Sequence, residues 1–193
     1  MGASFSVGDI GNAKNVVLVL LRSSPGGPEV LLTREGMRAA HKNRHKWALP
    51  GGGIDGVDRG SARNAYAREA REEVGLRVPM WFPHGDYDVD YVMCGSTAYF
   101  FRVLRPANSA LDGLLYPDGH VGFKFTDPRT GKKELDAAQW TPLSVVLRGG
   151  NSIMTYLKAK KQDSEGLRRC FAWCLKDPNV LGALRVLQGK LGG

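Results

Sequence analysis

The sequence predicts an α/β fold made of one domain, with additional helices at its C-terminus. Apolar segments rich in β-branched and aromatic residues, separated by glycine and proline turns, predict strands before residue 142. One segment among them has helical spacing, and the end of the chain is expected to be helical. The 193 residues are 42% hydrophobic and 24% charged, which is typical of a globular domain with a hydrophobic core.

The first predicted elements form a β-hairpin. Residues 1–13 are small and polar, so we expect a loose lead-in before a domain at 14–150. Val16–Arg22 is rich in β-branched residues and predicts a strand. The glycines and prolines of Ser24–Pro28 are a strong turn signal, and Val30–Thr33 predicts the returning strand.

A helix is predicted after a glycine run. The short apolar segment Trp47–Leu49 leads to Gly51, Gly52 and Gly53. Ser61 has the side chain of a helix cap, and the alanine-rich segment after it favours a helix. Gly75 is expected to end this helix, because glycine is common just past a helix C-terminus.

Further strands follow this helix. Thr97–Leu104, with its aromatic residues, predicts one strand, and Val121–Thr126 and Ala137–Thr141 are two more candidates. Residues 105–120 are expected to form a loop, and Pro142–Leu147 a helical turn.

The segment 151–193 is predicted to be a helical extension packed on the same domain. Asp177 followed by Pro178 is a helix-start signal. One apolar face follows from the spacing of Val180, Leu184, Leu187 and Leu191. We expect this face to pack on the core, and a homodimer interface is the alternative.

Charge and cysteine content limit the partners and the compartment. The net charge of +8 favours anionic partners, such as polyphosphates, RNA or an acidic membrane surface. Cys94, Cys170 and Cys174 include no CxxC pair, which argues against a disulfide framework or a zinc site. We expect Cys170 and Cys174 to be buried thiols in a reducing compartment, the cytoplasm.

The N-terminus carries a possible lipidation signal. Gly2 and Ser6 match the N-myristoylation pattern, which would make the membrane a partner only if Gly2 is acylated. The longest aliphatic run, Val16–Leu21, is too short to span a bilayer.

Three glutamates in the predicted helix carry the candidate chemistry. Glu69, Glu72 and Glu73 have i, i+3 and i+4 spacing, which places their carboxylates on one face. Such a cluster suits Mg²⁺ or Mn²⁺, and Arg68 is placed to hold Glu72 by a charge-assisted hydrogen bond. The alternative is a solvated helix face with i, i+4 ion pairs. The glycine-rich loop before the helix favours the first interpretation, because such loops present backbone N–H groups to phosphates.

The segment Arg68-Glu69-Ala70-Arg71-Glu72-Glu73-Val74-Gly75-Leu76 resembles the second half of the Nudix signature, Gly-x5-Glu-x7-Arg-Glu-U-x-Glu-Glu-x-Gly-U, where U is a bulky apolar residue. The likeness extends over about residues 14–147 and implies an α/β/α sandwich with a mixed sheet. The first half departs from the signature. Counting from Gly52 puts Asp58 at the glutamate position with a loop that is two residues longer, whereas counting back from Arg68 puts Gly60 there. We prefer Asp58, and we expect it to point at the metal cluster.

The resemblance implies Mg²⁺- or Mn²⁺-dependent attack of water on a phosphoanhydride by a pyrophosphatase. Glu69, Glu72 and Glu73 are the implied metal ligands, with Asp58 as an outer one. Glu73 or Glu134 is the implied general base, and Arg68 orients the carboxylates. Glu72 is counted among the catalytic residues as well.

The substrate is less defined by the sequence. The candidate substrate-binding residues are Gly51, Gly52, Gly53, Arg34, Lys46 and Tyr91. A nucleoside-diphosphate-linked compound or a dinucleoside polyphosphate is expected. Capped mRNA or a diphosphoinositol polyphosphate is an alternative, as is a weakened Nudix domain that binds nucleotide or RNA without cutting it.

Overall fold

The computed structural model describes residues 5–36, 43–74, 89–104, 135–162 and 164–192. Several predictions lie outside these residues: the acylation of Gly2, the helix end at Gly75, the strand at 121–126 and the role of Glu134.

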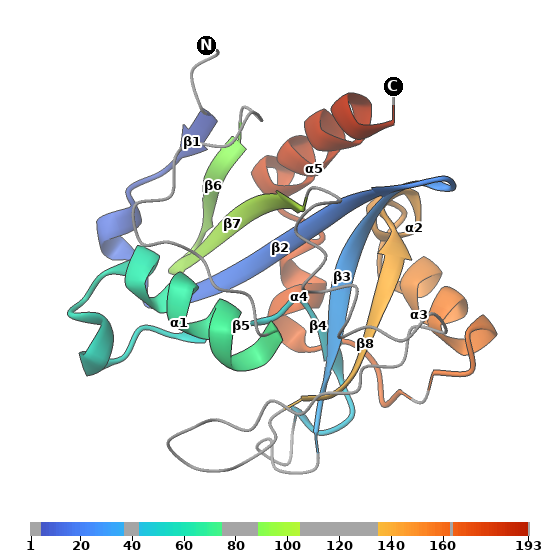
Figure 1. Ribbon diagram of the computed structural model, residues 1–193, viewed down its shortest axis with the longest axis horizontal. Coiled ribbons are helices and arrows are strands. Elements are labelled where there is room, and N and C mark those ends of the chain that lie inside the picture. The colour runs from blue at the N-terminus through green and yellow to red at the C-terminus, as the bar shows by residue number, and fades with distance from the viewer. Residues whose placement is uncertain (1–4, 37–42, 75–88, 105–134, 163, 193) are drawn as a thin grey trace.

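A mixed eight-stranded sheet forms the centre of the described structure (Figure 1). Its order is β1-β6-β7-β2-β3-β4, while β5 pairs with β2 and β8 pairs with β3. The strands are β1 (Phe5–Val7), β2 (Asn15–Ser24), β3 (Gly27–Glu35), β4 (Trp47–Ala48), β5 (Gly51–Gly53), β6 (Val89–Cys94), β7 (Thr97–Leu104) and β8 (Leu135–Pro142). The pairs β1·β6 and β2·β7 are parallel, and the other pairs are antiparallel.

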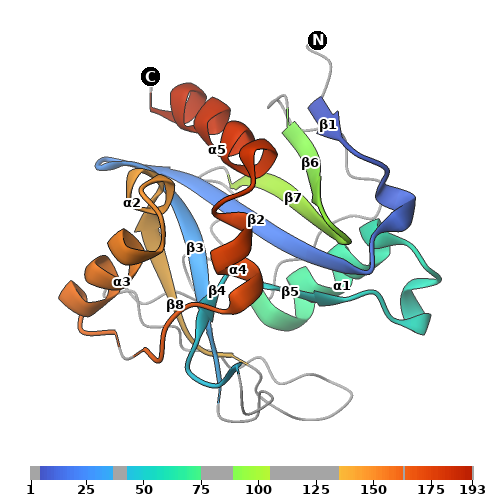
Figure 2. The same cartoon turned by 180° about the vertical axis from the view of Figure 1, so that it is seen from behind.

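Helices cover both faces of the sheet (Figures 1 and 2). Helix α1 (Ala62–Val74) packs on one face in a core cluster with the side chains of Leu18, Leu20 and Phe100. The other face carries α2 (Leu143–Leu147), α3 (Gly150–Ala159), α4 (Arg169–Cys174) and α5 (Pro178–Leu191). This arrangement confirms the predicted α/β/α layers and mixed sheet.

The predicted local signals explain most of these elements. Strands β2 and β3 form the expected hairpin, in which Arg22 lies opposite Glu29 and Ser24 opposite Gly27. Ser61 caps α1 by accepting a hydrogen bond from the Asn64 backbone N–H at 3.3 Å. Both signals arise within a few residues of the element that they define, so neighbouring sequence was sufficient to find them.

The N-terminal segment differs from the expected loose lead-in. Phe5–Val7 forms strand β1 against β6, and the Tyr91 hydroxyl donates to the Gly8 carbonyl at 3.2 Å. The short strand β1 and its partner β6 lacked a recognisable pattern. A three-residue edge strand depends on its neighbour in the sheet rather than on its own residues.

The C-terminal helices pack on the sheet. Asp177 accepts hydrogen bonds from the Asn179 and Val180 backbone N–H groups, as expected for a helix cap. Val180, Leu184 and Leu187 are buried in the core, so the predicted apolar face of α5 packs inward. Cys174 is buried as predicted, whereas Cys170 is exposed because it lies on the outer side of α4. Among the described residues, no helix is long and apolar enough to cross a membrane.

Candidate metal and phosphate site

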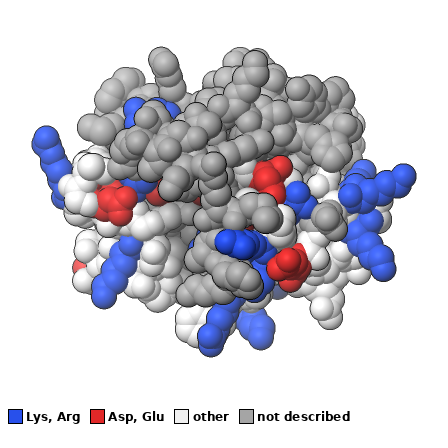
Figure 3. Space-filling model, turned by 90° about the horizontal axis from the view of Figure 1, so that it is seen from below, with Lys and Arg blue, Asp and Glu red and all other residues white. Residues whose placement is uncertain are grey.

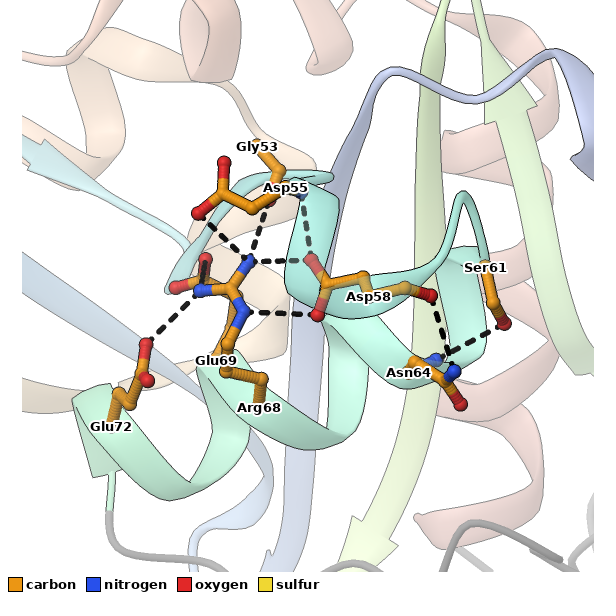
Figure 4. Close-up of polar contacts among 8 residues, drawn as sticks. All are labelled: Gly53, Asp55, Asp58, Ser61, Asn64, Arg68, Glu69 and Glu72. Carbon is orange, nitrogen blue, oxygen red and sulfur yellow. Dashed lines mark hydrogen bonds and ion pairs between the residues drawn. The ribbon is translucent and has the colours of Figure 1, made fainter.

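Arg68 joins the carboxylates of helix α1 to the loop that precedes the helix (Figure 4). Its Nη1 donates to Glu69 Oε1 at 2.7 Å and to Glu72 Oε2 at 3.0 Å. Its Nη2 donates to the Gly53 carbonyl oxygen at 2.8 Å. The hydrogen bond expected between Arg68 and Glu72 is therefore present, and the guanidinium also reaches a backbone group of the glycine run.

Asp58 lies on the other edge of the same guanidinium (Figure 4). Arg68 Nε donates to Asp58 Oδ1 at 3.0 Å, and Arg68 Nη2 donates to Asp58 Oδ2 at 2.9 Å. Asp58 Oδ2 also accepts from the Asp55 backbone N–H at 2.8 Å. The structure thus places Asp58, and not Gly60, against the arginine of the signature.

Asp58 was expected to point at the metal cluster, and the structure shows what surrounds its carboxylate. A solvent-exposed loop residue is excluded, because Asp58 is only 2% exposed and ends the 3-10 turn η3 (Gly56–Asp58). A direct metal ligand was preferred, yet both carboxylate oxygens accept hydrogen bonds from Arg68. The physical reason is geometric, since the two parallel N–H donors of a guanidinium match the two oxygens of a carboxylate.

The backbone of the glycine run lies close against the side chains of α1. The Gly51 backbone N–H donates to Glu73 Oε2 at 2.5 Å. A Cβ atom on Gly52 would lie 2.4 Å from Glu69 Oε1, so only glycine leaves room for that carboxylate. With the Gly53 contact to Arg68, each of the three glycines meets a different signature side chain.

Burial and charge make this cluster attractive to cations. Glu69, Glu73 and Asp58 are buried, and charged groups are buried in proteins only with compensating partners. The hydrogen bond with Asp58 raises the pKa of Arg68, burial opposes this, and the nearby Glu69 charge raises it further. Asp58, Glu69 and Glu72 all face this guanidinium, so the negative charge around it exceeds the charge that Arg68 supplies.

The donor chemistry fits a hard divalent cation, although the carboxylates are not gathered around one point. Carboxylate oxygens are the ligands that Mg²⁺ and Mn²⁺ prefer, and Gly52 leaves Glu69 a cradle that any Cβ would fill. Within the described part of the chain, no three His, Cys, Asp or Glu side chains converge closely enough to hold a metal ion. Arg68 lies between Glu69 and Glu72, where it supplies the positive charge in this arrangement.

Arg34 and Tyr91, two other predicted substrate-binding residues, contact groups outside this cluster. Arg34 Nε donates to Asp136 Oδ1 at 2.7 Å, and its guanidinium lies 5.9 Å from the Trp47 ring centroid. Trp47 belongs to the core on the face of the sheet away from α1, so Arg34 contacts the opposite layer. Lys46 is half-buried directly before β4, and the centroid of the Tyr91 ring lies 5.9 Å from that of Phe100.

Sequence reasoning missed the contacts that lock the loop before α1. The Asn64 side chain donates to the Asp58 carbonyl at 3.1 Å, and the Asp55 backbone N–H binds the Asp58 carboxylate. Opposite charges at Asp58 and Arg68 were a visible signal for a pair. Helical spacing could not predict this pair, because the two residues are ten positions apart and a turn of unknown shape lies between them.

Comparison with known proteins identifies the family. The family model described as "NUDIX domain" matches residues 12–161. No curated relative matches the chain.

Solved structures with similar folds include three that match over most of their length. The Ap4A hydrolase of C. elegans, solved as a binary complex, is 17% identical with a TM-score of 0.48, covering 92% of this chain and 98% of that one. A NUDIX hydrolase from Alicyclobacillus acidocaldarius is 18% identical with a TM-score of 0.45, covering 85% and 90%. The NUDIX domain of Shewanella oneidensis NrtR, complexed with ADP ribose, is 16% identical with a TM-score of 0.44, covering 83% and 89%.

The family match covers more than half of the chain, and it includes the whole of α1 and the glycine run whose contacts are described above. The chain therefore belongs to the NUDIX domain family.

Proposed function

We propose that this protein is a Mg²⁺-dependent hydrolase of a phosphoanhydride bond in a nucleoside-diphosphate-linked or dinucleoside polyphosphate substrate. The observation that carries the proposal is the set of contacts between α1 and the glycine run. Glu69 lies over Gly52, Glu73 binds the Gly51 N–H, and Arg68 ties Glu69 and Glu72 to Gly53. Acidic side chains and close-packed backbone therefore meet at one place, which suits metal-assisted hydrolysis of a phosphoanhydride.

The carboxylates of Glu69, Glu72 and Glu73 are the groups that would hold the ion. A bound Mg²⁺ or Mn²⁺ would neutralise phosphate oxygens and acidify the attacking water. Asp58 acts through Arg68, because it fixes the guanidinium that orients Glu69 and Glu72. Asp58 is therefore a positioning residue in this proposal.

A proton acceptor for the attacking water is also required. Glu73 is one candidate, and its hydrogen bond from the Gly51 N–H would stabilise the ionised carboxylate. Glu134 is the second candidate and lies outside the described residues. Replacing each of them in turn, and comparing the pH dependence of kcat, separates the two.

The test is a screen of product release with Mg²⁺ over nucleoside diphosphate sugars, ADP-ribose, dinucleoside polyphosphates, diphosphoinositols and capped RNA. Glu72→Gln and Glu73→Gln should fold normally and lose activity by at least about a hundredfold, because each removes a negative charge from the metal site. Glu165→Gln makes the same chemical change at an exposed residue and should keep the wild-type rate. Wild-type rates in both site variants would refute the assignment, and EDTA should abolish turnover.

A domain that binds nucleotide or RNA without cutting it is the second candidate. The observation in its favour is that Glu69 and Glu72 already form ion pairs with Arg68. Calorimetric binding of the same compounds, with and without Mg²⁺, decides between them. Tight binding without any turnover at high enzyme concentration would support this candidate over hydrolysis.

A further inference from the structure

The outer surface of α3, α4 and α5 combines exposed apolar and exposed basic side chains. Trp173 is 70% exposed and Val186 is 46% exposed, although both belong to helices whose inner sides pack in the core. The exposed basic residues of these three helices and of the segments next to them include Lys158, Lys160, Arg169, Lys176, Arg185 and Lys190. We call this surface the basic helical face, and we propose that it docks on an anionic lipid membrane.

The charge of this region complements an anionic surface. Residues 151–193 contain eight Lys or Arg and three Asp or Glu, which gives +5 of the net +8 of the chain. Asp177, one of the three acids, is occupied as the cap of α5. On the lower face seen in Figure 3, Lys and Arg side chains also project around the rim of the described surface.

Helix α4 presents the strongest membrane-like pattern. Arg169 and Trp173 have i, i+4 spacing, so they lie on one side of the helix, and Lys176 follows in the turn after it, where its backbone N–H donates to the Trp173 carbonyl. The exposed thiol of Cys170 is next to this row. An indole between two cations suits the headgroup region, where its apolar ring is buried and its N–H remains hydrated.

Lipid fits this surface better than nucleic acid does. Single-stranded nucleic acids bind grooves in which several aromatic side chains stack on successive bases. The basic helical face has one exposed aromatic residue, Trp173, among the described residues, and its other exposed large apolar residue is the aliphatic Val186. An aliphatic side chain gains from burial in lipid and provides no stacking surface.

Docking by this face would leave the candidate site open to solution. Helix α1 lies on the opposite face of the sheet from α3, α4 and α5 (Figures 1 and 2). Strand β1 begins at the same end of the molecule at which α5 ends (Figures 1 and 2).

The experiment is sedimentation of the full, unacylated chain with vesicles of phosphatidylcholine alone or with phosphatidylserine in a three-to-one ratio. We expect partitioning to be at least about tenfold stronger on the anionic vesicles and to weaken with added salt. Lys176→Glu should weaken it by about fivefold or more, and Trp173→Ser by about tenfold. Lys14→Glu, an equal charge change at an exposed residue of another surface, should leave it within about twofold.

Three results would overturn the proposal. The first is equal or absent binding to both kinds of vesicle. The second is a dimer in light scattering that Trp173→Ser dissociates, which would assign the face to a second copy of the chain. The third is binding of a short single-stranded RNA that Lys176→Glu and Trp173→Ser weaken while vesicle binding stays unchanged.

Discussion

At the scale of single residues, the contacts of Arg68 decide how the site is organised. Its guanidinium binds Asp58 with two donors and Glu69, Glu72 and the Gly53 carbonyl with the remaining hydrogens. An aspartate is one methylene shorter than a glutamate, so the η3 turn must bring the backbone of Asp58 close to the helix. Asn64 fixes that approach by donating to the Asp58 carbonyl.

We expect Asp58→Asn to loosen this network. The amide offers one oxygen acceptor instead of two and removes the charge that stabilises Arg68. Loss of one partner of a buried ion pair lowers the free energy of unfolding by about 3 kcal/mol. Because Arg68 then orients Glu69 and Glu72 less well, magnesium titrations of activity should also shift to higher concentrations.

Asp55→Asn is the matched control for this variant. The Asp55 side chain is 58% exposed and lies 3.8 Å from Arg68 Nη2, so its removal should change neither the unfolding midpoint nor the magnesium requirement. Superimposable titrations of Asp58→Asn and wild type would show that Asp58 has no positioning role.

At the scale of elements, the site is a junction between strand β5 and helix α1. Strand β5 pairs with the start of β2, with Gly52 opposite Val16 and Gly51 opposite Val17. This pairing holds the glycine run under the acidic side of α1. The three glycines have different neighbours. Substitutions at each one can therefore distinguish a role in folding from a role in the site.

Alanine substitutions in β5 should give three different results. Gly51→Ala should destabilise the fold, because its φ is +144° and its Cβ would lie 2.2 Å from the Val16 carbonyl oxygen. Gly52→Ala should keep the fold but displace the Glu69 carboxylate, and so lower activity by at least about tenfold. Gly53→Ala should change little, since its nearest new neighbour is 4.0 Å away.

Thermal unfolding and steady-state rates of the three variants test this assignment. Full activity in Gly52→Ala would mean that the Glu69 carboxylate need not lie over β5 for turnover. Equal destabilisation in Gly51→Ala and Gly53→Ala would mean that the backbone angle of Gly51 is not required.

The elements also show what sequence patterns can and cannot predict. The β2–β3 hairpin, α1 and the inward face of α5 were predicted because their signals are periodic or lie in adjacent turn and cap residues. Strands β1, β5 and β6 were not, since β5 consists of three glycines and β1 of three residues that only a partner strand orders. For the same reason, the i, i+4 contact of Arg68 with Glu72 was predicted, whereas its pairing with Asp58 required the shape of the η3 turn.

At the scale of the whole molecule, the sheet separates two layers with different chemistry. Helix α1 and the glycine run carry the acidic cluster on one face, while α3, α4 and α5 present basic side chains outward from the other. Between the second layer and the sheet lie the thiols of Cys94 and Cys174 and the phenol of Tyr99. These groups are packed at the junction of β6, β7 and α4. Their ionisation should therefore depend on whether the helical layer is packed against the sheet.

The last prediction concerns alkaline pH. Burial raises the pKa of Cys174 to about 12, opposed by the hydrogen bond from Tyr99 and aided by the charges of neighbouring thiols and of Asp177. Burial and a contact with Asp177 raise the pKa of Cys94 to about 11. A thiol whose pKa is raised in the folded state stabilises the fold, and this contribution is complete at pH values below its unfolded pKa of 9.0. The free energy of unfolding should therefore be constant up to about pH 9 and then fall by about 1.4 kcal/mol per pH unit for a fully buried thiol.

Urea unfolding at successive pH values measures this slope. Cys174→Ala should reduce the slope, leaving the part due to Cys94, although it lowers stability at neutral pH, whereas Cys170→Ser, at the exposed thiol of the same helix, should leave it unchanged. An equal slope in Cys174→Ala and wild type would show that the buried thiol does not govern the alkaline loss.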